Sequence, residues 1–127
     1  MNRIIFLLAV IGLFSSCKKE DIEIKEIIET KEIIEIKGIP NCLNEMINVV
    51  MERPVGNPPI KVYSYTYHKM KVYYSPPSCC DIPSTLIDTN CNFLCHPDGY
   101  ITGGGDGLCT DFLSTKINEK LVWEDPR

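Results

Sequence analysis

The residues with the clearest chemistry are cysteines, of which the chain has seven in 127 residues. So many cysteines in a short chain indicate an oxidising compartment outside the cytosol. Six of them predict three disulfides, whose pairing the sequence leaves open: Cys42, Cys79, Cys80, Cys91, Cys95 and Cys109. Adjacent Cys79 and Cys80 are not expected to pair with each other, because neighbouring α-carbons lie closer together than a normal disulfide requires. Zinc bound by Cys91 and Cys95, with His96 beside them, is the alternative, and it lacks a second well-spaced pair of ligands.

A glycine-rich stretch from residue 97 to 107 holds the next candidate site. Asp98 and Asp106 within it, and Asp111 just after it, supply the hard oxygen ligands that calcium prefers. Their spacing matches no EF-hand, and the lack of a lysine in the stretch excludes a Walker-type phosphate loop. The favoured interpretation is structural, with glycines at positive φ and aspartates that cap turns. We therefore predict no metal or other cofactor, with calcium on these aspartates as the alternative.

Tyr63, Tyr65 and Tyr67 alternate along a predicted strand and so share one face. Exposed, their rings would form an aromatic platform on which sugar rings stack. Tyrosine also suits strands and packs well, so burial beneath a helix is the favoured interpretation.

The sequence contains few residues or motifs that are typical of catalytic sites. It has two histidines, and neither a His-Glu-x-x-His nor a Gly-x-Ser-x-Gly motif is present. We therefore predict no catalytic residues. A protease-inhibitor loop at residues 53–59 is disfavoured, because Pro54 follows Arg53 directly. The net charge of −4 argues against a nucleic-acid partner.

The first seventeen residues resemble a bacterial lipoprotein signal. Arg3 precedes the apolar run Ile4 to Phe14, and two serines lead to Cys17. Eleven apolar residues are too few to span a bilayer core of about 30 Å. The resemblance implies removal of residues 1–16 and membrane attachment through acyl chains such as palmitate on Cys17. An ordinary cleaved signal is the alternative.

Residues 17–38 are predicted to be the lipidated cysteine and a spacer rich in isoleucine, glutamate and lysine. The period of six in this segment forms no single apolar helix face, although a partner-binding helix is the alternative. Lys18-Lys19-Glu20-Asp21 resembles the signal that directs Bacteroidetes lipoproteins to the outer face of the outer membrane. We expect display on that face, with a periplasm-facing position as the alternative.

Residues 39–127 are predicted to form one domain. Asn41 is the expected N-cap of a helix with apolar residues at i, i+3, i+4, i+7 and i+8, from Leu43 to Met51, and Arg53-Pro54 is expected to end it. Two hairpins follow, formed by residues 60–67 with 70–75 and by 86–87 with 93–94, and residues 121–123 close a sheet edge. His68-Lys69 is poor chemistry for a two-residue turn, so a longer connection is expected. The predicted fold class is α+β, with one N-terminal helix on a small antiparallel sheet, disulfide links and a loop-rich C-terminal half.

The ordered cysteine and Gly-Asp-Gly positions resemble those of small Bacteroidetes lipoproteins with a cysteine-rich domain of unknown function. The motifs are Cys79-Cys80-Asp81, Leu86-Ile87-Asp88, Cys91-Asn92, Cys95-x-Pro97-Asp98-Gly99, Gly105-Asp106-Gly107-x-Cys109, Asp111-Phe112 and Leu121-Val122-Trp123-x-Asp125. Tyr100 departs from the pattern, where a second glycine is expected. The resemblance implies no activity. The expected function is a non-enzymatic binding or structural module whose partner is an envelope protein or a glycan, with a calcium- or glycan-binding envelope module as the alternative.

Overall fold

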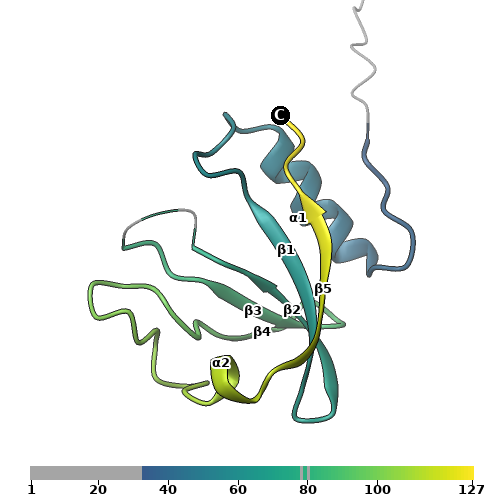
Figure 1. Cartoon of the computed structure of the whole chain (residues 1–127). Coiled ribbons are helices and arrows are strands. Elements are labelled where there is room, and N and C mark those ends of the chain that lie inside the picture. Colours follow the sequence, from purple (N-terminus) through teal and green to yellow (C-terminus); the bar gives the residue numbers. More distant parts are fainter. Residues whose placement is uncertain (1–32, 78, 80) are drawn as a thin grey trace, which may run out of the picture. The chain divides into compact units, whose positions relative to one another are not determined.

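The computed structural model describes residues 33–77, 79 and 81–127 (Figure 1). The predicted signal peptide, Cys17 and most of the predicted spacer therefore lie outside the described residues, as does Cys80. The described chain forms an α+β domain in which one long helix and a second, short helix accompany a five-stranded antiparallel sheet. The predicted fold class is confirmed. Neither helix in the described ranges has the length and hydrophobicity that crossing a bilayer requires.

Helix α1 (Asn41–Met51) forms where the apolar spacing predicts it. The prediction that Asn41 caps the helix is wrong, because Pro40 holds the N-cap position. The carbonyl of Pro40 accepts the backbone N–H groups of Leu43 and Asn44. Proline suits the start of a helix because its φ is fixed, at −59° here, and its missing N–H leaves no donor unsatisfied.

The sheet consists of β1 (Lys61–Tyr67), β2 (Met70–Ser75), β3 (Thr85–Asp88), β4 (Phe93–Cys95) and β5 (Ile117–Glu124). The strands lie in the order β4-β3-β2-β1-β5, and all neighbours are antiparallel. Both predicted hairpins are confirmed. The C-terminal strand β5 closes the edge beside β1, as predicted, and is longer than the predicted three residues.

The turn between β1 and β2 is tighter than the sequence predicts. Tyr67 pairs with Met70, which leaves only His68 and Lys69 in the turn. Both have positive φ, 48° and 65°, as the two central residues of a type I′ turn require. The His68 ring compensates for this unfavourable conformation by its edge contact with the Tyr67 ring and its bond to the Asp111 carboxylate.

Because side chains alternate along the strands, the sheet has two faces, and each is covered. The α1 face lies beneath α1, and its buried residues are Leu43, Ile47, Val62, Tyr73, Ile87 and Trp123. The loop face lies beneath the segment from residue 96 to 116, and its buried residues are Tyr65, Tyr67, Val72, Tyr74, Leu86, Cys95 and Phe112. Tyr65 and Tyr67 therefore pack on the face away from α1, not beneath the helix as predicted. The loop cover contains a helix that was not predicted, α2 (Phe112–Thr115).

The segment before α1 is held against the helix by side-chain amides. Asn44 Oδ1 accepts the Ile36 N–H at 2.8 Å, and Asn44 Nδ2 donates to the Ile36 carbonyl at 3.2 Å. Asn48 makes the same pair of bonds with Ile34, both at 2.9 Å. The two asparagines lie one helix turn apart on the same face of α1. This spacing is close to the distance between residues i and i+2 of an extended segment, so each asparagine reaches one isoleucine. Ile34 and Ile36 were predicted to belong to the spacer. These bonds make them part of the folded domain.

The other end of α1 is closed by Arg127. Its guanidinium donates to the carbonyls of Met51 at 3.0 Å and Arg53 at 2.8 Å. It also donates to the buried Asp125 carboxylate at 2.6 Å, and this bond lowers the pKa of Asp125. A helix C-terminus has carbonyls without intrahelical partners and a partial negative charge, so a cation stabilises it.

Candidate functional site

Two disulfides fix the loops around the sheet. Cys42 of α1 is linked to Cys91 in the turn between β3 and β4, and Cys95 is linked to Cys109 across residues 96–108. The zinc alternative is wrong for Cys91 and Cys95, because each sulfur already has a different disulfide partner. Two of the three predicted disulfides are thus present. Cys79 is exposed and Cys80 lies outside the described residues. Because the other four of the six cysteines are paired, a third disulfide among them would have to join these two neighbours, which is not expected of adjacent residues, so the predicted total of three conflicts with the observed pairing.

The segment enclosed by the second disulfide is the glycine-rich loop (residues 96–108). A Cβ at Gly105 would lie 1.9 Å from the His96 carbonyl oxygen, and one at Gly99 would lie 2.6 Å from the α-carbon of Pro83. Both glycines also have positive φ. The prediction that glycines serve the loop's conformation is confirmed at these positions. Tyr100, in the place where a glycine was expected, has a φ of 59°.

A small polar cluster joins the glycine-rich loop to the segment before β3. Ser84, which is fully buried, donates its hydroxyl to the Asp98 carbonyl at 3.1 Å and accepts the Asp98 N–H at 3.0 Å. The His96 Nδ1 donates to the Ser84 carbonyl. Because a carbonyl only accepts, Nδ1 carries the proton, and Nε2 is an acceptor when the ring is neutral. The cluster fixes the orientation of the His96 ring.

The three aspartates of the calcium alternative are not brought together. Asp98 accepts the Tyr74 hydroxyl at 2.8 Å. Asp106 accepts the backbone N–H groups of His96 at 2.8 Å and Leu108 at 3.0 Å. Asp111 lies at the other end of the loop cover, where it accepts the Tyr67 hydroxyl. No group of three potential ligands of a metal ion occurs among the described residues. Each aspartate therefore has a structural partner. Only Asp106 binds backbone N–H groups, as a turn cap does, whereas the side chains of Asp98 and Asp111 bind tyrosine hydroxyls.

The tyrosine platform is wrong as an exposed surface. Tyr65 and Tyr67 are buried, and both rings meet the Phe112 ring edge-on, at centroid distances of 5.7 and 5.3 Å. Tyr63 is only partly buried, against the same cluster. The packing interpretation holds, with Phe112 rather than α1 as the cover.

Buried tyrosine hydroxyls on the loop face are paired with carboxylates. Tyr65 donates to Glu119 at 2.6 Å, and Tyr67 donates to Asp111 at 2.7 Å. Burial, with the carboxylate bond as a second cause, raises the pKa of Tyr67 to about 12 and that of Tyr65 further. The same bonds lower the pKa of Asp111 and Glu119. Asp111 also binds His68 Nε2 at 2.9 Å. This His–Asp pair orients a ring, and no hydroxyl or thiol nucleophile contacts His68 among the described residues.

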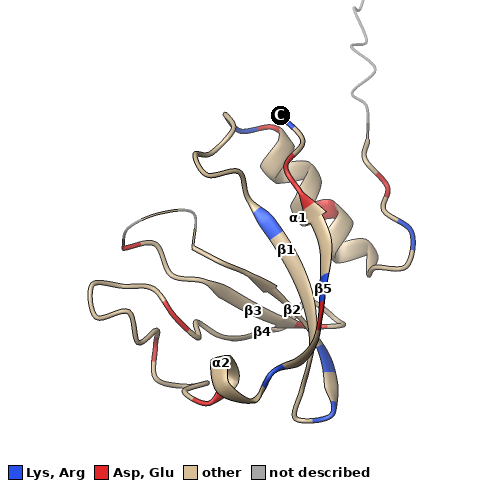
Figure 2. Ribbon diagram, viewed as in Figure 1, with Lys and Arg blue, Asp and Glu red and all other residues tan. Residues whose placement is uncertain are grey.

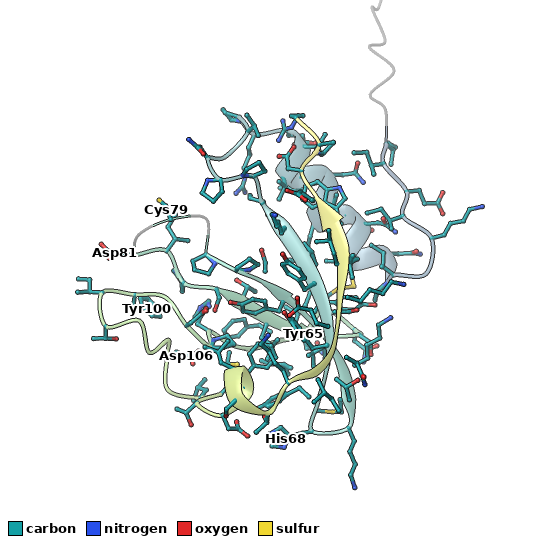
Figure 3. All side chains as sticks on the ribbon, in the orientation of Figure 1. Tyr65, His68, Cys79, Asp81, Tyr100 and Asp106 are labelled. Carbon is teal, nitrogen blue, oxygen red and sulfur yellow. A yellow bond between two sulfur atoms is a disulfide. The ribbon has the colours of Figure 1, made fainter. Side chains whose placement is uncertain are left out.

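The rings that are exposed come from a part of the chain that sequence reasoning did not single out. Phe93 of β4 is 51% exposed and Tyr100 is 41% exposed, and the His96 ring lies between them. Ring centroids are 4.7 Å apart for Phe93 and His96, and 5.8 Å apart for His96 and Tyr100. Figure 3 shows Tyr100 on the projecting loop, whereas Tyr65 lies inside the domain. The available signal was three aromatic or imidazole rings within eight residues. We call Phe93, His96 and Tyr100 the ring row.

The fold and the site define a class: a small α+β domain whose antiparallel sheet is covered on both faces and whose loops are closed by disulfides. Residues 48–125 match the family described as Domain of unknown function (DUF6970), and the chain belongs to this family. The match begins within α1 and ends at the Asp125 that binds Arg127. No curated protein and no solved structure matches the chain.

Proposed function

We propose that the protein is a lipid-anchored envelope protein whose domain binds a glycan through the ring row. The anchor is supported by the sequence of residues 1–17, and an outer-membrane position by Lys18–Asp21. The binding role replaces the predicted tyrosine platform with a different set of rings. It is a non-enzymatic function, in which residues hold a ligand and transfer no group.

The ring row carries this proposal. Aromatic side chains on a protein surface favour binding, because each combines apolar area with little conformational freedom. A sugar has apolar C–H faces for Phe93 and Tyr100 to contact, and hydroxyl groups for polar atoms to bind. His96 Nε2 and the Tyr100 hydroxyl provide such polar atoms beside the rings.

The rigidity of the support favours the same conclusion. His96 is fixed by Ser84, and the loop that bears Tyr100 is closed by a disulfide and by glycines that contact other backbone segments. A surface that is already ordered loses less entropy when a ligand binds. The site is thus preorganised for weak, specific contacts.

Glycan binding is tested with the full chain and two defined oligosaccharides, chitotetraose and mannotetraose, by NMR titration. We expect sugar-dependent shifts at Phe93, His96 and Tyr100, and their loss in Phe93→Ala and Tyr100→Ala. Leu108→Ala is the matched control, because Leu108 is also exposed on the glycine-rich loop but lies outside the ring row. No sugar-dependent shift at the ring row, or equal loss in the control, would contradict the proposal.

The anchor is tested separately by intact-mass measurement of protein from its native membrane. We expect the mature chain to begin at a lipid-modified Cys17, and Cys17→Ser to release the protein from the membrane. A soluble wild-type protein cleaved elsewhere would refute the anchor and leave the glycan test unaffected.

A further inference from the structure

We propose that a lysine-lined hollow at the start of the domain binds a phosphate group. The hollow has a volume of about 140 Å³ and lies between the segment before α1 and the sheet. We call it the lysine hollow, and it is lined by Ile36, Lys37, Gly38, Ile39, Ser64, Lys71, Lys120, Leu121 and Val122. No carboxylate lines it. It is separate from the ring row, which lies on β4 and the glycine-rich loop.

Strand pairing explains why the polar groups meet. Ser64 of β1 lies directly opposite Lys120 of β5, so their side chains share a face of the sheet. Lys71 of β2 lies opposite Thr66, which is two residues from Ser64 and therefore on the same face. The Lys71 ammonium lies 5.3 Å from the centre of the Tyr73 ring, on the α1 face. Figure 2 shows basic residues on the β1–β2 hairpin, on β5 and on the segment before α1.

The charges of the lysine hollow are uncompensated within the described part of the chain. Three other cations of the domain do have carboxylate partners: Lys61 binds Glu124, Lys116 contacts Glu119, and Arg127 binds Asp125. Lys37, Lys71 and Lys120 make no ion pair with any described residue. Such a gathering of positive charge is unexpected in a chain of net charge −4. A bound anion would relieve the mutual repulsion of the three ammonium groups.

Ser64 places a hydroxyl in the hollow. The residue is 6% exposed and lines the hollow, and its hydroxyl makes no hydrogen bond to another described residue. Among the described residues the buried side-chain polar atom without a partner is Asp98 Oδ1, so the Ser64 oxygen is open to the hollow, where it is available to a ligand. A phosphate oxygen accepts from a hydroxyl and from ammonium groups alike.

The segment that supplies Lys37 is held in place before any ligand binds. Ile36, its neighbour, is fixed at both its N–H and its carbonyl by Asn44. The other lysines project from paired strands. The lysine hollow is therefore assembled from four ordered elements, the segment before α1 and strands β1, β2 and β5. Its size suits a tetrahedral anion with a few waters. We infer a phosphate group, either free or at the end of a larger molecule.

The first test is titration of the full chain with inorganic phosphate, at an ionic strength kept constant with sodium chloride, followed by NMR. We expect saturable shifts at Ser64, Lys71 and Lys120. Lys71→Gln and Lys120→Gln each weaken binding by at least about threefold, a modest effect because the ammonium groups are partly hydrated. Ser64→Ala also weakens binding and keeps every charge.

The matched control is Lys69→Gln, which removes one positive charge two residues from Lys71 but outside the hollow. Its phosphate affinity stays unchanged if the site is specific. The proposal is overturned if chloride at equal ionic strength produces the same shifts, or if Lys69→Gln weakens binding as much as Lys71→Gln. Since these lysines are exposed, the variants are expected to fold, and circular dichroism verifies this.

The source of the phosphate group is identified with vesicles. Full-length Cys17→Ser, which lacks the proposed acyl anchor, is mixed with phosphatidylcholine vesicles that do or do not contain phosphatidic acid. Lysine-dependent binding only to vesicles with phosphatidic acid identifies a lipid headgroup, and binding to inorganic phosphate alone identifies a soluble phosphorylated molecule. Binding to neither overturns the proposal.

Discussion

The two faces of the sheet are closed in different ways. The α1 face is covered by a regular helix whose backbone bonds are internal, and its buried residues are almost all apolar. The loop face is covered by residues 96–116, which contain only a four-residue helix. On that face three tyrosine hydroxyls are bonded to carboxylates, and a disulfide closes the cover.

The difference shows what an irregular cover requires. A loop has few internal backbone bonds and must satisfy its polar groups through other contacts. Here the Asp106 carboxylate accepts backbone N–H groups, while closely packed glycines and a disulfide fix the course of the backbone. The outer surface of this loop need not follow the spacing of a helix, and it carries part of the ring row.

The largest expected effects come from the disulfides. Chain-entropy arguments give about 4 kcal/mol for a link that spans 49 residues and about 3 kcal/mol for one that spans 14. We expect the double variant Cys42→Ser/Cys91→Ser to lose more stability than Cys95→Ser/Cys109→Ser, as measured by urea unfolding. Hydrogen exchange distinguishes the faces: loss of the second link should expose amides of the loop cover first and leave α1 protected. Equal exposure of both covers would contradict the division into two faces.

Glycine substitutions in the loop cover have a smaller effect. Gly103 and Gly105 have nearly equal φ, 71° and 67°, but only Gly105 faces backbone atoms at contact distance. Gly103→Ala is expected to cost about 1 kcal/mol from its backbone conformation alone. Gly105→Ala should cost about 2 to 3 kcal/mol, because the His96 carbonyl cannot move aside without breaking the cover. Thermal unfolding measures both, and equal costs would show that the contact is readily relieved.

Two neighbouring tyrosines of β2, one on each face of the sheet, allow a direct comparison of the two faces. Tyr74 points to the loop face and donates to Asp98, whose other oxygen is buried without a partner. Tyr73 points to the α1 face, and its hydroxyl makes no bond to another described residue. Tyr74→Phe is expected to cost about 1 to 2 kcal/mol because it leaves a buried carboxylate oxygen unsatisfied. Tyr73→Phe should stay within about 0.5 kcal/mol in the same urea assay. A reversed order would contradict the polar character assigned to the loop face.

The smallest expected effect concerns how ionisation of the loop-face tyrosines changes the stability, because it appears only at alkaline pH. The pKa of Tyr67 is raised from about 10 in the unfolded chain to about 12, so the unfolded state loses its proton first as the pH rises. The stabilisation is therefore fully present below pH 10 and is lost as the pH approaches 12. Tyr65 and Tyr74 shift in the same direction. Absorbance of tyrosinate should show that these residues ionise only with unfolding, and ionisation near pH 10 in a native protein would contradict the buried bonds.

Local patterns were sufficient for the elements that have a regular period. The apolar spacing predicted α1, and the alternation of residues predicted β1 and its hairpin partner β2. The shared face of Tyr63, Tyr65 and Tyr67 was predicted as well. Alternation does not indicate which segment covers a face, so the position of these tyrosines beneath Phe112 was not predictable. The tight turn at His68 was missed because its support comes from Asp111, far along the chain.

The candidate site was less predictable for the same reason. Cysteine partners depend on which loops meet, and the sequence gives no measure of that distance. The aspartates of the calcium alternative were grouped by their proximity in sequence, whereas the structure assigns each a separate partner. The exposure of Phe93 follows from the position of β4 at the sheet edge, which the short strand does not reveal.

The bond between Arg127 and the end of α1 can form only late in the synthesis of the domain. A ribosome makes α1 early, but the guanidinium that closes its C-terminus follows 74 and 76 residues later. The helix is therefore without this partner until Arg127 has been made. The C-terminal end of α1 is then completed only when the strand that leads to Arg127 has folded back beside it.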